Sequence, residues 1–471
     1  MKFKTLILIF LFTLLSVVVR GYEFGLGNQE HYLVYLNYYQ HLFLYSRDYL
    51  LQTHQIPYTI FVSALNFLPL QSSDFQITVF GIYFLLLFVF YFSIYRLVLA
   101  LFSSRSLAWI ALFLLIIPIP IGGSSIATLE KQLNPRFVGE VALVLSLYLV
   151  SIKKLYASSF IAGLGFLFHP LTLIPFPGIF LIYAYLTRTP AKKIIGPLSV
   201  FIITSSPILS KYLSAQSGAT FFMDRDWRSV IDERLSYIFA LRWSILDWLL
   251  TLSIPAFFLG YSFFKKIPPL VLSGLIVGLA LFIVNIISDL LSLRVGLQLQ
   301  LTRNLYIVIV FCLFYVAQLL DLAFRSVSAK YYLLGGLLVL DILVCFPGRL
   351  TDGLLWQRPL SDYEKSAVWA GQHTPQDSLF LVPEETTGFR LWSSRSVVVE
   401  RKEGGDSLYD RNLALTWDSR EDLLEDNYYQ MDANRLSSLE RQFHFNYFVT
   451  TQSLPLPLAN KQGDWKIYLI K

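Results

Sequence analysis

The sequence predicts an all-α polytopic membrane bundle of about 11 transmembrane helices, followed by a C-terminal extracytoplasmic α/β domain. The chain has 471 residues, of which 55% are hydrophobic and 16% aromatic, and its mean hydropathy of +0.55 is too high for a soluble globule. Charge divides the chain: residues 1–348 carry 24 Lys and Arg against 14 Asp and Glu, whereas residues 349–471 carry 14 against 18. Cys312 and Cys345 both fall in apolar runs, so neither a disulfide framework nor a zinc site is indicated.

Each span is predicted from an apolar run of roughly 17 to 25 residues, the length that a helix needs to cross about 30 Å of hydrocarbon. Prolines shorten or interrupt several of these runs, so one of them could be re-entrant. The first run also resembles a signal peptide, but it lacks a clear small-x-small cleavage site and is interpreted as a span. The predicted spans are 4–20, 76–101, 106–122, 137–152, 155–170, 171–187, 194–213, 243–264, 267–289, 304–323 and 331–348.

The distribution of basic residues in the short loops predicts the orientation. With the N-terminus inside, Asp321 is the acidic residue nearest to the inner basic segments, and an odd number of spans places the C-terminal domain outside. The outer loops then receive nearly all of the acidic residues. The inner segments contain Lys2, Lys4, Arg105, Lys153, Lys154, Arg188, Lys192, Lys193, Lys265, Lys266, Arg325 and Lys330.

The first outer loop, residues 21–75, is long for a connection in a compact bundle, and long loops of this kind are usually functional. It contains no helix breaker between residues 30 and 48, and the helical period aligns Glu30, Asn37, His41 and Asp48 within about 20° of one line. This predicts an amphipathic helix at the membrane surface, with its tyrosines at headgroup depth. In a continuous helix Glu30 and Asp48 would lie about 27 Å apart, so only one of them could act on a given atom. A polar stripe that merely faces water is the alternative.

The C-terminal part, from residue 349 to 471, is predicted to be a soluble α/β domain. The sequence "SDYE" at 361–364 is a capping box that opens a helix through about residue 371, and another helix is expected at 433–442. The segment "FRLWSSRSVVVERK", residues 389–402, indicates a role in acceptor binding or in covering a site, or else an ordinary strand pair that carries arginines. Strands are predicted at 378–382, 388–392, 396–400, 445–450 and 465–470.

These features resemble GT-C-type glycosyltransferases: a long first outer loop with an acidic residue after span one, "HPLT" at 169–172, many spans and an outer C-terminal domain. The closest resemblance is to a largely uncharacterised bacterial branch of such membrane proteins. It implies the bacterial cytoplasmic (inner) membrane and a polyprenyl-phosphate-linked sugar as donor. The catalytic carboxylate of the family corresponds by position to Glu30, with Asp48 second, although the family typically shows Asp there. A carboxylate would accept the proton of an acceptor hydroxyl as it attacks the anomeric carbon.

The departing lipid phosphate needs cationic stabilisation, and outer basic residues are candidates for it. Anchoring of a helix end to lipid headgroups is the alternative for each of them. His169, which precedes Pro170, fits either helix capping or a ligand contact. No histidine pair has the i, i+4 spacing of a known metal motif, so a divalent cation held by His31, His41 or His54 with Glu30 or Asp48 stays open. The candidate substrate-binding residues are His31, Arg47, His54, Lys131, Arg136, His169, Arg294 and Arg303.

Two further functions are compatible with the sequence. A transporter or flippase for a lipid-linked or polysaccharide precursor would be favoured by internal repeats, and no convincing self-similarity is present. A non-catalytic GT-C-like assembly protein would use the outer domain for binding. The partners expected are the lipid bilayer, the polyprenyl-phosphate-linked sugar and an acceptor glycan, lipid or protein, and no nucleic acid. The sequence leaves the sugar and the acceptor open.

Overall fold

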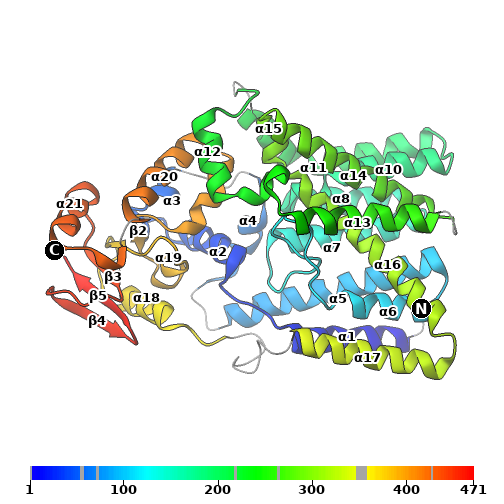
Figure 1. Ribbon diagram of the computed structural model, residues 1–471, viewed down its shortest axis with the longest axis horizontal. Coiled ribbons are helices and arrows are strands. Elements are labelled where there is room, and N and C mark those ends of the chain that lie inside the picture. The colour runs from blue at the N-terminus through cyan, green and yellow to red at the C-terminus, as the bar shows by residue number, and fades with distance from the viewer. Residues whose placement is uncertain are drawn as a thin grey trace.

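The protein has two parts, a bundle of long helices and an outer layer of short helices and a small sheet (Figure 1). The computed structural model describes residues 3–53, 58–70, 74–216, 220–262, 266–345, 358–425 and 428–470. The N-terminus lies at the end of the bundle that is remote from the outer layer, and the C-terminus lies at the far edge of the outer layer (Figure 1). The two termini therefore lie at opposite ends of the molecule.

Each of the eleven predicted spans overlaps an α-helix among the described residues, but the helix in the predicted span 106–122 ends at Leu114. Six helices are long and apolar enough to cross a membrane, namely α1, α5, α11, α14, α16 and α17, as expected of an integral membrane protein. The other apolar helices do not meet that criterion over their described residues. The bundle comprises α1 (Phe3–Arg20), α5 (Phe75–Phe102), α6 (Arg105–Leu114), α7 (Pro135–Ser151), α8 (Leu155–Phe168), α9 (Pro170–Leu173), α10 (Pro175–Leu186), α11 (Lys192–Gln216), α13 (Ile245–Ser262), α14 (Pro269–Leu290), α16 (Leu305–Ala323) and α17 (Val327–Cys345).

The bundle is apolar on its surface as well as inside. Tyr185, Ile203 and Leu343 are 82%, 70% and 67% exposed, respectively, which a soluble protein would rarely tolerate over so many helices. Small residues allow the helices to approach closely: Gly165 of α8 lies against Ala142 of α7, where a side chain would collide. The exposed apolar surface therefore faces lipid.

The outer layer is built from four separate stretches of chain, of which the third, residues 294–304, lies beside the second. The first outer loop contributes α2 (Gly27–Gln40), α3 (Tyr49–Thr53) and α4 (Phe61–Leu65). The second stretch contributes α12 (Arg225–Arg234), η1 (Ser236–Ile238) and η2 (Ala240–Arg242), with α15 (Arg294–Gln298) and η3 (Leu301–Asn304) beside it. The C-terminal stretch contributes α18 (Asp362–His373), α19 (Phe389–Ser393), η5 (Arg401–Leu408), α20 (Arg411–Glu425), η6 (Tyr428–Gln430), α21 (Ala433–Phe443) and the sheet.

A shared hydrophobic core joins these stretches. Trp227 and Ile231 of α12 are buried in the same cluster as Leu381, Val399 and Trp417 of the C-terminal stretch. The indole N–H of Trp227 donates to the carbonyl oxygen of Ser407 at 2.8 Å. The change in charge near residue 349 therefore does not mark the edge of an independently packed unit, because residues of the preceding half complete this core.

The small sheet has five strands in the order β2-β1-β3-β5-β4. Strand β1 pairs in parallel with β2 and β3, and β5 pairs antiparallel with β3 and β4. The structure confirms the capping box that opens α18, in which Ser361 and Glu364 bond to each other's backbone N–H groups. The strands are β1 (Leu379–Leu381), β2 (Ser396–Val397), β3 (Tyr447–Thr450), β4 (Leu458–Gln462) and β5 (Trp465–Leu469).

Two sequence predictions in the outer layer are corrected, and one strand was not predicted. The predicted strand at 388–392 is helix α19, which is bracketed by Gly388 at φ 98° and Ser394 at φ 52°. Strand β4 was not expected, because "LANKQ" is polar and lies at the sheet edge. The predicted helix over 30–48 ends at Gln40 as α2, and Tyr35 and Tyr45 are buried in the core instead of lying at headgroup depth.

Candidate functional site

A cavity of about 580 Å³ lies between the membrane helices and the outer layer. Its apolar wall comes from α8, α10 and α11, and the rest of its lining comes from outer-layer segments and the outer ends of helices. This combination of an apolar wall with a few converging polar groups is typical of a ligand site. The apolar wall includes Phe166, Pro177, Phe201, Ile208, Leu209 and Leu213.

Two predicted arginines, Arg136 and Arg303, line the cavity close to the bundle. Asn134 caps α7 by accepting the N–H of Phe137 at 2.8 Å, and Pro135 follows as the first helical residue, so Arg136 falls in the first turn. Arg136 is ion-paired with Glu130. Arg303 donates to the neutral hydroxyl of Tyr237 at 3.3 Å, so it keeps its positive charge uncompensated by that contact.

His169 is both a helix cap and a cavity residue. Its Nδ1 accepts the N–H of Thr172 at 3.3 Å at the start of α9, which confirms the capping interpretation. A ring nitrogen that accepts carries no proton, so in the neutral ring Nε2 holds the N–H. His169 therefore offers one hydrogen-bond donor to a ligand near Arg136 and Arg303, which line the same cavity.

An acid–base pair lies where α2 meets η5. His31 Nε2 is 3.2 Å from Asp406 Oδ2, and both residues line the cavity. The hydroxyl of Tyr58 donates to Asp406 Oδ1 at 3.1 Å, which fixes the carboxylate from a second side. A histidine beside a carboxylate is a common arrangement for accepting a proton from a hydroxyl. Sequence reasoning named His31 but missed Asp406 and Tyr58, which come from distant parts of the chain.

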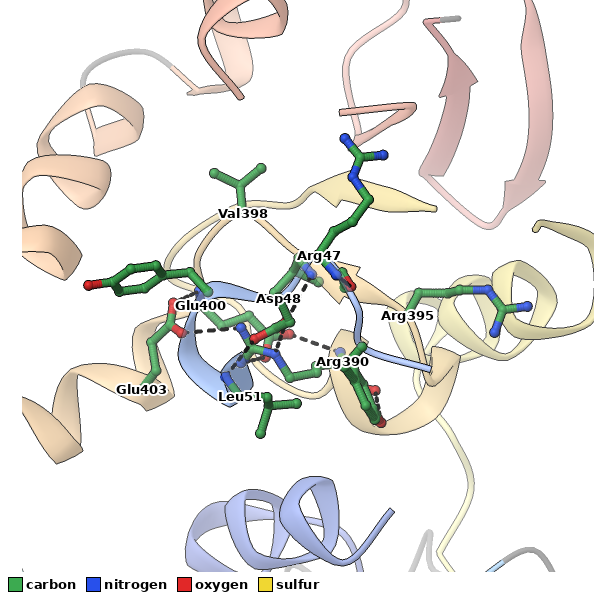
Figure 2. A network of polar contacts seen from close by, with 12 residues as sticks. Arg47, Asp48, Leu51, Arg390, Arg395, Val398, Glu400 and Glu403 are labelled. Atoms are coloured by element: carbon green, nitrogen blue, oxygen red, sulfur yellow. Dashed lines mark hydrogen bonds and ion pairs between the residues drawn. The ribbon is translucent and has the colours of Figure 1, made fainter. Parts of the chain in front are cut away.

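Asp48 lies in a buried ion network instead of the cavity (Figure 2). Its Oδ2 accepts from Arg390 Nε at 2.7 Å and from the backbone N–H of Val397 at 3.2 Å. Arg390 is only 3% exposed and also pairs with Glu400 at 3.2 Å and Glu403 at 3.1 Å. These contacts tie the first outer loop to the C-terminal stretch, which is a structural arrangement.

Glu30 faces the same network and is not among the described residues that line the cavity. Burial raises the pKa of Glu30 to about 6, while hydrogen bonds from Thr387 and Gly388 and the nearby charges of Lys402 and Arg390 oppose the rise. Burial likewise raises the pKa of Glu400 to about 7, and Glu30 adds to this shift by repulsion. Glu400 therefore retains part of its protons near neutral pH, whereas Glu30 ionises as pH rises through about 6.

The stability of this interface is expected to fall as pH rises. A carboxyl group whose pKa is raised from 4.5 to about 6 stabilises the folded state at pH values below 4.5, and this stabilisation is lost as pH rises through 6. For Glu30 alone the loss is about 2 kcal/mol between pH 4.5 and pH 8. The free energy of unfolding, measured by chemical denaturation of the full chain in detergent between pH 5 and pH 8, reports this loss of stability. Glu30→Gln should flatten the dependence, and a stability that rises over this range would contradict the prediction.

The remaining predicted residues lie elsewhere. Arg47 donates to Asn446 Oδ1 at 2.7 Å and belongs to the contact with the C-terminal stretch. Lys131 pairs with Glu23 at 3.4 Å at the surface. Arg294 is buried at the start of α15 and does not line the cavity. His54 lies outside the described residues. Within the described part of the chain, no three His, Cys, Asp or Glu side chains gather as metal ligands.

In a comparison with known proteins, part of the chain matches a domain family of unknown function. Residues 361–424 match the family described as Domain of unknown function (DUF6798). This match begins at the capping box of α18 and ends in α20, so it includes Arg390, Glu400 and Asp406. No curated protein matches the chain. The matched segment therefore contacts α2 and contributes to the lining of the cavity.

Proposed function

We propose that the protein is a GT-C-like membrane glycosyltransferase that moves a sugar from a polyprenyl-phosphate donor to an acceptor at the outer face of a bacterial cytoplasmic membrane. The cavity carries this proposal, because it combines an apolar wall of membrane helices, cations for a phosphate and an acid–base pair in one space. We infer that the eleven apolar segments all cross the membrane. The N-terminus is inside and the outer layer outside, as the basic inner loops favour.

The donor fits the cavity in one direction. Its polyprenyl chain lies along Phe201 and Leu209 of α11, while its phosphate is bound by Arg136, Arg303 and the Nε2 donor of His169. Arginine suits this role because its fork of N–H groups matches two phosphate oxygens. The sugar then lies toward the outer layer, beneath the pair of His31 and Asp406.

The transfer follows from this placement. The acceptor hydroxyl oxygen forms a bond to the anomeric carbon as the bond from that carbon to the phosphate oxygen breaks. The bonding electron pair leaves with the phosphate, where Arg136 and Arg303 stabilise the developing charge. The hydroxyl proton passes to His31, and Asp406 stabilises the resulting imidazolium. We assign the base to His31 with Asp406 in place of Glu30, whose carboxylate bonds to Thr387 and Gly388.

Reconstitution of the purified protein with polyprenyl-phosphate sugars tests the function, provided that donor consumption and donor movement across the bilayer are both followed. Arg303→Gln is expected to slow consumption by about 100-fold or more, because it removes a cation from the leaving phosphate. Arg325→Gln is the matched control, since Arg325 is exposed at the opposite end of the bundle. Movement without consumption in the wild type would contradict the proposal in favour of a flippase. Neither consumption nor movement would favour a non-catalytic assembly protein.

A further inference from the structure

Two more cations line the cavity, and both belong to the outer layer. Lys402 comes from η5 and Arg234 from the last turn of α12. The ammonium of Lys402 donates to the side-chain oxygen of Asn28 at 3.0 Å. Arg234 donates through Nε at 2.9 Å and Nη2 at 2.8 Å to the carbonyl oxygen of Arg401. Both cations are thus held in place by neutral acceptors, which fix their position without cancelling their charge.

The charges around these two side chains do not balance. Asp406 is the only carboxylate among the described residues that line the cavity, against the four cations Arg136, Arg234, Arg303 and Lys402. Asp406 is already in contact with His31 and Tyr58. Arg234 and Arg136 repel Lys402, whereas Asp406 attracts it from within the cavity lining and Glu30 attracts it from outside. Arg136 is paired with Glu130, so the excess positive charge of the lining lies on Arg234, Arg303 and Lys402, and such an excess is typical of an anion site.

We propose that Lys402 and Arg234 bind a second anionic group, a phosphate or a carboxylate, at the outer-layer end of the cavity. This group is separate from the lipid phosphate assigned to Arg136 and Arg303, because Arg136 lies in the first turn of α7 and Arg303 directly before α16, whereas Lys402 and Arg234 come from η5 and α12. It enters either on the acceptor or as the second phosphate of a diphosphate donor. That the anion belongs to an acceptor or to a donor rests on the proposed function. That Lys402 and Arg234 bind an anion does not.

The shape of the site agrees with such a ligand. The guanidinium of Arg234 lies over the ring of Trp417, 6.0 Å from its centroid, at the outer limit of a cation–π contact. Among the described residues, its Nη1 makes no hydrogen bond and is left for a ligand. The ammonium of Lys402 is a compact charge with rotatable N–H donors, so an anion can approach it from several directions. Together they present one oriented donor and one adaptable donor to the same anion.

Binding to the full-length protein in lipid nanodiscs tests the proposal with three probes: inorganic phosphate, a polyprenyl monophosphate and a polyprenyl diphosphate. The double variant Lys402→Gln with Arg234→Gln is expected to weaken binding of inorganic phosphate or of the diphosphate by about tenfold or more. It should change the Kd of the monophosphate by less than about threefold. Arg401→Gln, an exposed neighbour in η5, is the matched control.

The three probes distinguish a second anion that is part of the donor from one that is part of the acceptor. A loss for the diphosphate places the second anion on the donor, and a loss for inorganic phosphate alone places it on a soluble acceptor. Unchanged binding of both probes, or an equal loss for all three, would overturn the proposal. A wild-type protein that fails to bind the monophosphate would count against the proposed function, while the inorganic phosphate arm would still decide the second anion. Thermal unfolding of each variant establishes that it is folded.

Discussion

Replacing Arg390 with methionine is expected to destabilise the outer layer by about 3 to 5 kcal/mol, because it leaves buried carboxylates without their cation. Asp48, Glu400 and Glu403 all bond to this one guanidinium, and each of the three is nearly inaccessible to solvent. The same change disconnects the first outer loop from the C-terminal stretch. Hydrogen exchange of the full chain measures the effect, with lost protection expected in α2, α19 and η5.

The control for this change is Arg401→Met, eleven residues further along the same stretch. The Arg401 side chain is 49% exposed, and its nearest carboxylate, on Glu421, lies at 3.8 Å. An exposed pair of this kind contributes about 0 to 1 kcal/mol, so protection should stay almost unchanged. Equal losses in the two variants would show that the Arg390 network does not hold the outer layer together.

The second large effect is expected in the transfer reaction. Asp406→Asn should lower the rate of donor consumption by about 10²- to 10⁴-fold, because the amide cannot stabilise the protonated form of His31. Glu30→Gln should change the rate by less than about threefold, since Glu30 is not among the described residues that line the cavity. The rate at saturating donor, measured beside the Kd of the polyprenyl monophosphate, separates chemistry from binding.

The rates of Asp406→Asn and Glu30→Gln distinguish the two candidates for the general base, which are His31 with Asp406 and Glu30. An unchanged Kd with a lost rate in Asp406→Asn supports the pair of His31 and Asp406. A lost rate in Glu30→Gln with normal transfer in Asp406→Asn would return the base to Glu30. Loss of the rate and of binding together in Asp406→Asn would show that Asp406 positions the donor instead of assisting proton transfer.

Hydropathy and local signals predicted the helices well, because their causes lie within short stretches of sequence. The length of an apolar run and the capping box at 361–364 each depend on neighbouring residues, and both appear in the structure. The tyrosine-rich segment was misjudged for the opposite reason. Its helix α2 is covered by α19, more than 300 residues away, so a polar stripe that looked solvent-exposed is buried.

The same distinction explains the candidate site. His31, Arg136, His169 and Arg303 were named from the sequence and line one cavity, because all four lie at or near the ends of apolar helices on the side of the first long loop. Asp406 could not be found in this way, since its partner His31 lies 375 positions earlier. The segment 389–402 had been singled out for its arginines, and its strongest charge contacts proved to be structural.

The most direct test of the central claim is an electron cryomicroscopy structure of the full-length protein with a bound polyprenyl monophosphate. The account predicts phosphate density within about 3 Å of the guanidinium groups of Arg136 and Arg303, with the chain running along Phe201 and Leu209. Lipid density confined to the outer surface of the bundle, with the cavity free of lipid, would contradict it.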